Sequence, residues 1–301
     1  MEPRSLPSYH LTFEIGGISL SIDSDLPLKK ETFVFKFQLF RCTNEGDVSV
    51  TIHHHCGLPK IRDWGEEIYH RAPWIIYETP SGYIYKMFVE GNSQFHLVAT
   101  FNKDHSEGHI YKGKNYVQTF KEGDLASLLC FPTDQILFAP LLADRGGIIL
   151  HGSGLIFKEK GYLFVGHSDA GKTTLVKIFN HHARILNDDR MIVKKEDGSF
   201  YLYGTPWHGE LSLVAPDRVP LKAIFFLNQA KDNRIERIEG LEAFKGLYGC
   251  TIKSLVTEIW AKNALDICQL LSREVPCYHL YFDKSGTVIS TIEKVEKGVR
   301  S

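Results

Sequence analysis

Hydrophobic and polar residues alternate along much of the first third of the chain. Short runs with an apolar residue at every second position are typical of strands with one buried face, and polar or glycine-containing breaks separate them. The segment YHLTFEIGGISLSID, residues 9–23, alternates on both sides of a Gly-Gly pair, which predicts a hairpin. From about residue 8 to about residue 118 the pattern predicts an antiparallel sheet, whose further strands are SVTIHHH, WIIYET, GYIYKMFV and FHLVATFN.

The pattern changes to helical spacing near residue 123. Apolar residues recur at intervals of three and four in GDLASLLCF (123–131) and in TDQILFAPLLADRGG (133–147), which predicts two helices. In the second, Thr133 or Asp134 offers an N-cap and the pair Gly146-Gly147 offers a stop.

Strands and helices then alternate to the end of the chain. This order is typical of an α/β fold. We therefore predict a β-rich N-terminal domain over residues 1–125 and an α/β nucleotide-binding domain over residues 126–301. The predicted strands of the second domain are 148–157, 162–166, 183–189, a hairpin that turns at Asp197-Gly198, 221–229 and 277–282, and its helices are 172–182, 241–252 and 254–275, before a charged tail.

Charge and composition exclude several classes of protein. The 35 Lys and Arg residues against 36 Asp and Glu leave a formal charge of −1, so there is no global electrostatic reason to bind nucleic acid or an anionic membrane. No apolar run approaches the length of a bilayer span, and the start of the chain lacks the apolar core of a secretory signal. The six cysteines are scattered and form no C-x-x-C pair, which favours reduced thiols and a cytoplasmic protein.

A glycine-rich loop carries the clearest chemistry. The stretch GYLFVGHSDAGKTTLVKIF (161–179) runs from an apolar strand through G-x-x-x-x-G-K-T into an apolar helix, the context of a phosphate-binding loop. Backbone amides and the helix N-terminus would hold the phosphates of ATP, while Lys172 would supply a charge and the Thr173 hydroxyl a magnesium ligand. The predicted nucleotide-binding residues are Gly166, His167, Ser168, Asp169, Ala170, Gly171, Lys172, Thr173 and Thr174.

Two acidic residues and a histidine complete the candidate chemistry. Asp188 and Asp189 end an apolar strand that follows the loop after a single helix, the arrangement in which an acid holds Mg²⁺ beside the phosphates. Two adjacent acids allow one to bind the metal while the other accepts a proton from a hydroxyl. His151 ends a strand just before the loop, where it could contact phosphate or orient a carboxylate.

Together these motifs carry a family resemblance. LHGSG, GYLFVGHSDAGKTTL and ILNDDRMIV, in this order and spacing, resemble the catalytic core of the HPr kinase/phosphorylase family, whose wider relatives include the phosphoenolpyruvate carboxykinases. The resemblance implies an α/β P-loop kinase domain of this type. It also implies that Lys172 and Thr173 bind phosphates and Mg²⁺, that one acid serves the metal, that the other deprotonates a serine hydroxyl, and that His151 sits beside the reacting phosphate. We predict Asp188 nearer the metal and Asp189 nearer the hydroxyl; the reverse order stays open.

The chain also departs from the family pattern. The family follows its loop Lys-Ser with Glu, where this chain has Thr174. Its later Arg-Gly-Leu-Gly-like signature is replaced by YGTPWHGE (203–210), and the N-terminal region matches no family regulatory domain. These departures argue against HPr as the substrate and against a reverse phosphorylase activity. Instead, the chain resembles divergent relatives that accompany peptide-modification gene clusters, some of them similar to kinases of ribosomal peptide precursors.

Two further motifs allow more than one interpretation. In YGTPWHGE, Trp207 and His208 could line an acceptor pocket, or Trp207 could simply be buried under a loop. The run HHHC (53–56) contains potential zinc ligands. In a strand, however, His53 and His55 face one side while His54 and Cys56 face the other. Because the sequence shows no second ligand cluster, this run alone does not predict zinc.

Three functions are compatible with these residues. The first is an ATP- and Mg²⁺-dependent kinase that phosphorylates a serine hydroxyl of a protein or peptide, without nucleic acid or membrane as partner. The second is a small-molecule phosphotransferase of the phosphoenolpyruvate carboxykinase-related group, and the third is a non-catalytic nucleotide-binding module. The sequence leaves the acceptor, the choice between ATP and GTP and the formation of a homo-oligomer open.

Overall fold

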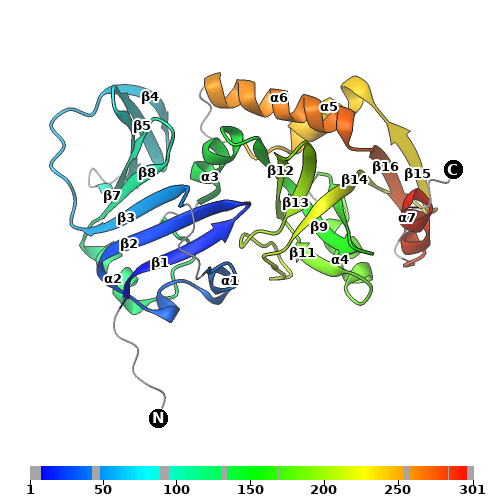
Figure 1. Cartoon of the computed structure of the whole chain (residues 1–301), viewed down its shortest axis with the longest axis horizontal. Helices are drawn as coiled ribbons and strands as arrows, with labels where there is room; N and C mark the ends of the chain where they lie inside the picture. Colours follow the sequence, from blue (N-terminus) through cyan, green and yellow to red (C-terminus); the bar gives the residue numbers. More distant parts are fainter. Residues whose placement is uncertain are drawn as a thin grey trace, which may run out of the picture. The chain divides into compact units, whose positions relative to one another are not determined.

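The structure is a computed structural model that describes residues 8–42, 48–88, 95–129, 134–167, 170–253, 258–283 and 285–296. The chain divides into two compact units, Met1–Leu141 and Leu142–Ser301. Each has its own large sheet, so the fold is a mixed α/β arrangement built on two sheets (Figure 1).

An eight-stranded sheet in the order β1-β2-β3-β8-β7-β6-β5-β4 forms the first unit. The predicted hairpin is present, because Gly16 and Gly17 adopt positive φ angles of 62° and 68° and turn the chain between β1 and β2. Short helical turns η1 and α1 follow β2. The strands are β1 (Ser8–Ile15), β2 (Ile18–Leu28), β3 (Val50–Cys56), β4 (Glu66–Arg71), β5 (Trp74–Thr79), β6 (Gly82–Phe88), β7 (Phe95–Asn102) and β8 (Glu107–Lys112), and the turns are η1 (Lys30–Thr32) and α1 (Phe35–Gln38).

One strand of this sheet departs from the antiparallel prediction. Strand β3 runs parallel to both of its neighbours, β2 and β8, whereas the remaining neighbours along the sheet pair antiparallel. Parallel neighbours need a crossover instead of a tight turn, and the long segments that precede β3 and β8 provide it. The alternation within a strand specifies its faces but not the direction of its neighbours.

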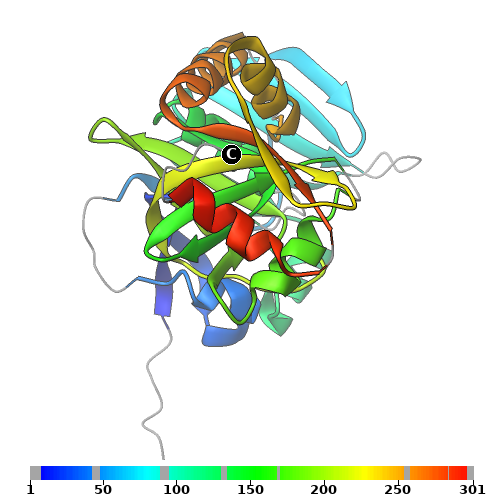
Figure 2. The ribbon, with the colours of Figure 1, turned by 90° about the vertical axis from the view of Figure 1, so that its right-hand side faces the viewer.

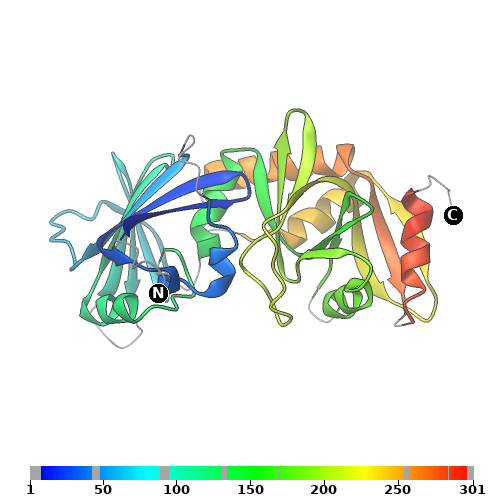
Figure 3. The ribbon, with the colours of Figure 1, turned by 60° about the horizontal axis from the view of Figure 1, so that its bottom comes forward.

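The segment between this sheet and the second unit also differs from expectation. Residues 114–122 form helix α2 (Lys114–Glu122), which lies beside β7 and β8 (Figure 3), although the pattern predicted strands to about residue 118. No helix forms over the described part of 123–131. There the Asp124 and Leu125 amides donate to the carbonyls of Glu31 and Thr32 instead.

Further hydrogen bonds, centred on Asp134, hold the end of the first unit. The buried carboxylate of Asp134 accepts hydrogen bonds from Ser127 Oγ and from the amides of Leu128 and Leu129, and His54 Nε2 lies 2.9 Å from Leu128 O. Residues 127–129 and the first residue of α3 (Asp134–Ala143) are thus tied to one another, and Leu128 is tied to the first sheet through His54. The compact unit therefore extends past the boundary expected between residues 125 and 126. The proposed cap Thr133 lies outside the described residues.

The second unit contains the other sheet, with the order β10-β9-β12-β13-β14-β16-β15 and with β11 paired to β9. Strand β14 is long enough to pair with β13 near its start and with β10 and β16 further along, so the pairings close a ring through β10, β9, β12, β13 and β14. The strands are β9 (Gly147–Phe157), β10 (Lys160–Val165), β11 (Arg184–Asn187), β12 (Arg190–Glu196), β13 (Ser199–Tyr203), β14 (Arg218–Gln229), β15 (Arg234–Ile238) and β16 (Cys277–Phe282).

Local chemistry explains the two tight hairpins of this unit. Lys158 and Glu159, at φ 50° and 61°, turn the chain between β9 and β10, and Asp197 and Gly198, at φ 48° and 80°, turn it between β12 and β13. The second turn is the one predicted, because Asp-Gly tolerates the left-handed backbone that a two-residue hairpin needs. The first turn falls on the first two of the four residues, 158–161, that the sequence pattern left between the two predicted strands.

Within the described residues of this unit, the helices beside the sheet are α4 (Lys172–Phe179), α5 (Gly240–Cys250), α6 (Glu258–Glu274) and α7 (Val288–Glu296). Helix α4 buries Leu175, Val176 and Phe179 in a core with the aromatic residues of β10 and β14. Helix α7, seen in red in Figure 2, adds Val288 and Ile292 to this core, although the sequence predicted only a charged tail. No helix in the described ranges combines the length and apolar character needed to cross a bilayer.

Candidate functional site

The glycine-rich loop (residues 166–173) leads from β10 into α4, as predicted. Gly171 caps the helix at φ 101°, a left-handed conformation that favours glycine, and a Cβ atom there would lie 2.6 Å from the Phe282 ring. A β carbon on Gly166 would lie 2.7 Å from the Ala170 side chain. The two fixed glycines are therefore required by the shape of the loop. Ser168 and Asp169 lie outside the described residues.

Lys172 folds back over the loop. Its ammonium group donates to Gly166 O at 2.8 Å and to His167 O at 3.0 Å, and the residue is 8% exposed. Thr173 and Thr174 follow in the first turn of α4 and are half-buried. Lys172 thus holds a positive charge at the N-terminus of a helix, where the helix dipole also favours anions.

Cys250 contacts this loop from the end of α5. Its thiol is hydrogen-bonded to the Gly166 backbone and lies near the Lys172 ammonium. Burial raises the pKa of Cys250 and outweighs the opposing effect of the lysine charge, so the thiol is neutral at physiological pH. The sequence analysis did not select Cys250, because only the fold brings α5 to the loop.

The sheet brings the loop close to the Asp pair (Asp188 and Asp189). Val165, immediately before the loop, is the register partner of Gly152, and the Gly152 amide donates to Asp189 O at 3.0 Å. A β carbon on Gly152 would approach Phe164 O to 2.7 Å, so glycine allows this close approach. At one strand spacing per step, the start of the loop and Asp189 are roughly 10 Å apart.

Asp188 is buried and held by backbone amides. Its two carboxylate oxygens accept hydrogen bonds from Gly209 N at 2.7 Å and from Leu211 N at 2.8 Å, and the residue is only 4% exposed. Asp188 therefore anchors the segment 204–211, which we call the 204–211 loop. A β carbon on Gly209 would lie 3.0 Å from Asp188 Oδ2 and from Asp189 Cβ, so the loop approaches the Asp pair closely.

Asp189 has different partners and is more accessible. His151 Nδ1 lies 3.0 Å from Asp189 Oδ1, Arg190 Nη1 contacts Asp189 Oδ2, and the carboxylate side chain is 24% exposed. Burial opposes ionisation, but the hydrogen bond from His151, the Arg190 charge and their further contacts together hold the pKa of Asp189 below its usual value. Asp189 is thus an ionised carboxylate at neutral pH.

Arg190 joins the histidine and the carboxylate into one cluster. Its Nη1 atom also lies 2.9 Å from His151 Nδ1. That ring nitrogen donates to the carboxylate in one tautomer and accepts from the guanidinium in the other. Arg190 was assigned only to a strand by its sequence pattern, and no local signal marks it. The register of β9 and β12, which pairs it with His151, places it here.

His151 lies within a strand and does not end one. Strand β9 continues for six residues beyond it to Phe157, and β9 runs antiparallel to β10. The prediction that His151 closes a strand is therefore wrong. Its position opposite Arg190 and beside Asp189 comes from register, not from a strand end.

Asn187 fixes the backbone of the Asp pair. Its side-chain oxygen accepts from the amides of Asp189 and Arg190 at 2.8 and 2.9 Å, and its Nδ2 donates to Thr205 O at 2.8 Å. The fully buried Asn187 therefore makes an Asx-type turn that presents successive acids in different directions. The sequence ILNDD contains the turn signal that could have identified it.

In the region YGTPWHGE, Tyr203 ends β13 and residues 204–210 belong to the 204–211 loop. Trp207 is buried at 5% exposure, as one of the two interpretations predicted, and His208 Nδ1 lies 2.7 Å from Gly209 O. Thr205 Oγ1 donates to Arg190 O at 2.6 Å. The loop is therefore bonded to the same strand end as the Asp pair.

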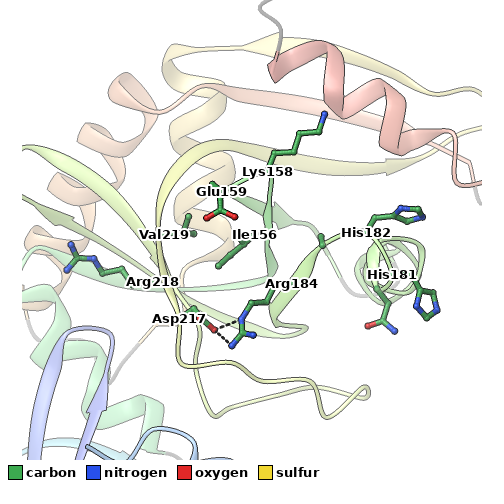
Figure 4. A pocket seen from close by; sticks show the side chains of 11 residues that line it. Ile156, Lys158, Glu159, His181, His182, Arg184, Asp217, Arg218 and Val219 are labelled. Atoms are coloured by element: carbon green, nitrogen blue, oxygen red, sulfur yellow. Dashed lines mark hydrogen bonds and ion pairs between the residues drawn. The ribbon is translucent and has the colours of Figure 1, made fainter.

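A charged cavity of about 650 Å³ lies elsewhere in this unit (Figure 4). Arg184 and Asp217 form an ion pair at its wall, with Nε and Nη2 each 2.6 Å from Asp217 Oδ2. Residues 180–184 follow the C-terminus of α4, so the length of this helix, roughly 12 Å, separates the cavity from Lys172. The cavity is thus distinct from the candidate site.

Comparison with protein families matches most of the second unit. The family described as "SynChlorMet cassette protein ScmC" matches residues 135–297, more than half of the chain. The chain belongs to the ScmC family. All of the candidate site residues named above lie within the part that matches this family.

Other comparisons add little to this assignment. A solved structure of the Hpr(Ser) kinase/phosphatase from Coxiella burnetii is similar at 9% identity and a TM-score of 0.30, covering 51% of this chain and 99% of that chain. Comparison with curated proteins gives no match.

Proposed function

We propose that the chain is an ATP-dependent kinase of the cytoplasm that transfers a phosphate to a serine hydroxyl of a peptide or protein. The observation that carries this proposal is that the start of the glycine-rich loop lies about two strand spacings from Asp189, and that Lys172 donates to Gly166 O at this start of the loop. A cation held in a glycine-rich loop at a helix N-terminus suits a nucleotide phosphate. A nearby carboxylate can accept the proton of the hydroxyl that attacks this phosphate.

The loop fits a nucleoside triphosphate with Mg²⁺. The left-handed Gly171 and the N-terminus of α4 are features that point backbone amides at phosphate oxygens. The Lys172 ammonium donates hydrogen bonds to the loop carbonyls of Gly166 and His167, and a bound phosphate can replace these acceptors. Thr173 would contribute its hydroxyl to Mg²⁺, and the ion, when bound, neutralises charge on the phosphates.

The two acids fit different tasks. Asp189 is ionised, partly exposed and oriented by His151 and Arg190, which suits a group that accepts the proton of a serine hydroxyl. Asp188 is buried, and each of its carboxylate oxygens accepts a hydrogen bond from an amide of the 204–211 loop. A carboxylate oxygen has a second lone pair, and this second lone pair is the one that could bind a metal. These contacts support the order in which Asp188 serves the metal side and Asp189 the acceptor.

The choice of acceptor draws on the family description and on the loop beside Asp189. The family description names its members cassette proteins, so peptides and proteins of the same cassette are the first acceptors to test. The 204–211 loop borders Asp189 through Gly209 and Thr205, and an acceptor chain would have to pass along it.

Transfer of labelled phosphate tests the proposal. The full chain is incubated with Mg²⁺ and ATP labelled at the γ-phosphate, with cassette peptides that contain serine and with the same peptides in which serine is replaced by alanine. We expect label on the serine peptides only, located by mass spectrometry, and loss of labelling in Asp189→Asn. Label on a small metabolite instead supports a small-molecule phosphotransferase. Nucleotide binding without any transfer supports a binding module.

A further inference from the structure

A second cluster of potential ligands lies in the first unit, on the open face of the N-terminal sheet. Register pairs Asp23 of β2 with His53 of β3, and His53 with His109 of β8, in two parallel ladders. Side chains two residues apart on a strand share a face, so Asp25 and His55 join them. His54 points the other way and is fully buried.

The atoms of this cluster are at the spacing of metal ligands. His53 Nε2 lies 2.9 Å from Asp25 Oδ1, His55 Nδ1 lies 3.5 Å from Asp25 Oδ2, and ligand atoms of Asp25, His53 and His55 all lie within 4.8 Å of one another. A tetrahedral Zn²⁺ with bonds of about 2.0–2.1 Å holds its ligand atoms roughly 3.3 Å apart. Small movements of these side chains would therefore be enough for the three ligand atoms to coordinate one metal ion.

Neighbouring groups orient these three side chains. His55 Nε2 lies 3.0 Å from His109 Nδ1, a contact that leaves His55 Nδ1 to face Asp25. The Cys56 amide donates to Asp25 Oδ2 at 3.0 Å. The rings of His53 and His55 stack with their centroids 4.3 Å apart, and the Tyr111 ring stacks on His55 with a centroid distance of 4.7 Å. Such outer contacts are what orient histidine and carboxylate ligands in metal sites.

We propose that Asp25, His53 and His55 bind a divalent transition-metal cation of the zinc class, with His109 orienting His55. Two imidazoles and one carboxylate are a ligand set that Zn²⁺ and Co²⁺ accept. The side chains of these three residues remain 43%, 34% and 28% exposed, so water can complete the coordination. The run HHHC did not predict this site alone, because Asp25 and His109 come from other strands.

Cobalt provides a direct test, because Co²⁺ bound by histidine in a tetrahedral site absorbs visible light. The full chain is first stripped with a chelator and then titrated with Co²⁺, followed by competition with Zn²⁺. We expect wild-type protein to bind one equivalent of Co²⁺ with this absorption and Zn²⁺ to displace it. The double variant His53→Ala/His55→Ala should lose that equivalent, while His70→Ala, an exposed histidine on β4 of the same unit, should keep it.

Two further variants keep the test independent of misfolding. Asp25→Asn preserves the shape of the side chain and should weaken the site, and His109→Gln should lower affinity about 10- to 100-fold, as expected for an orienting group. Circular dichroism checks that each variant is folded. A wild type that takes up no Co²⁺, or a folded double variant that takes up the same equivalent with the same affinity, overturns the proposal.

Discussion

His151 Nδ1 lies 3.0 Å from Asp189 Oδ1; His151 belongs to β9, and Asp189 immediately precedes β12, the strand that pairs with β9 at this point. Because Arg190 contacts both of them, the carboxylate is fixed on two sides. This pairing makes the role of the histidine testable apart from nucleotide binding, since the loop that contains Lys172 lies on the other side of β9.

We predict that His151→Ala lowers phosphate transfer far more than it lowers nucleotide affinity. Loss of the ring frees the Asp189 carboxylate to move, and a displacement of about 1 Å in a reacting group costs roughly 100-fold in rate. Single-turnover transfer and calorimetric titration with magnesium–ATP measure the two quantities. A variant that merely melts at a lower temperature, with normal turnover per folded molecule, would show that the role of His151 is structural.

The lowered pKa of Asp189 predicts a pH dependence of stability. A carboxylate whose folded pKa is below the unfolded value stabilises the protein fully above the unfolded pKa, here 3.8, and this contribution is lost as the pH falls through the folded pKa. In Arg190→Met the folded pKa should rise, so less stability should be lost on acidification. Urea midpoints of wild type and variant at pH 7 and pH 3 measure this, and equal changes in both proteins would contradict it.

We expect Lys172→Ala to weaken magnesium–ATP binding by roughly 100-fold or more, the scale of removing one partner of a buried charge pair. The fold should survive, because the ammonium donates to the loop carbonyls of Gly166 and His167 and contributes no apolar core. Lys177→Ala, an exposed lysine of the same helix, is the matched control. Calorimetry should show a loss in the first variant alone; unchanged affinity there would remove the loop from the proposed function.

Local sequence chemistry predicted the parts of this fold that depend on a few neighbouring residues. Gly16-Gly17 and Asp197-Gly198 turn their hairpins because those residues accept positive φ, and the apolar spacing after Lys172 produced helix α4. The sequence pattern gave the wrong secondary structure where contacts with residues far away in the sequence determine it. Over 123–129, the described part of the predicted helix 123–131, backbone bonds from Asp124 and Leu125 to η1 override the helical spacing.

The candidate site shows the same division. The loop and the Asp pair were visible as motifs because their chemistry lies in consecutive residues. Arg190 and Cys250 were not, since strand register and the packing of α5 bring them to the site. The N-terminal ligand cluster was hidden for the same reason, because parallel pairing of β3 with β2 and β8 has no signal within the run HHHC.

Two glycines of helix α5 test the packing of the second unit. A β carbon on Gly246 would lie 2.4 Å from the Phe226 ring, whereas one on Gly249 would have no neighbour within 4 Å. Gly246→Ala should therefore destabilise the protein by about 1–3 kcal/mol, the usual cost of overpacking. Gly249→Ala should be neutral or stabilise by about 0.5–1 kcal/mol, because alanine favours helix. Chemical denaturation of both variants gives the two values, and similar destabilisation by both would refute the packing described here.

The two acids of the Asp pair should not be interchangeable. Asp→Asn removes the charge and keeps the shape. At Asp189 it should leave nucleotide binding nearly intact and slow transfer by roughly 100-fold or more, the usual scale for losing a general base. At Asp188 the new amide nitrogen cannot accept from Gly209 N or Leu211 N, so one buried donor loses its partner at a cost of about 1–3 kcal/mol, and the dependence on Mg²⁺ should weaken. Unfolding curves, magnesium-titrated ATP binding and transfer are measured side by side for both single variants. If both transfer phosphate at the wild-type rate, the Asp pair takes no part in the reaction and the proposed kinase mechanism is wrong.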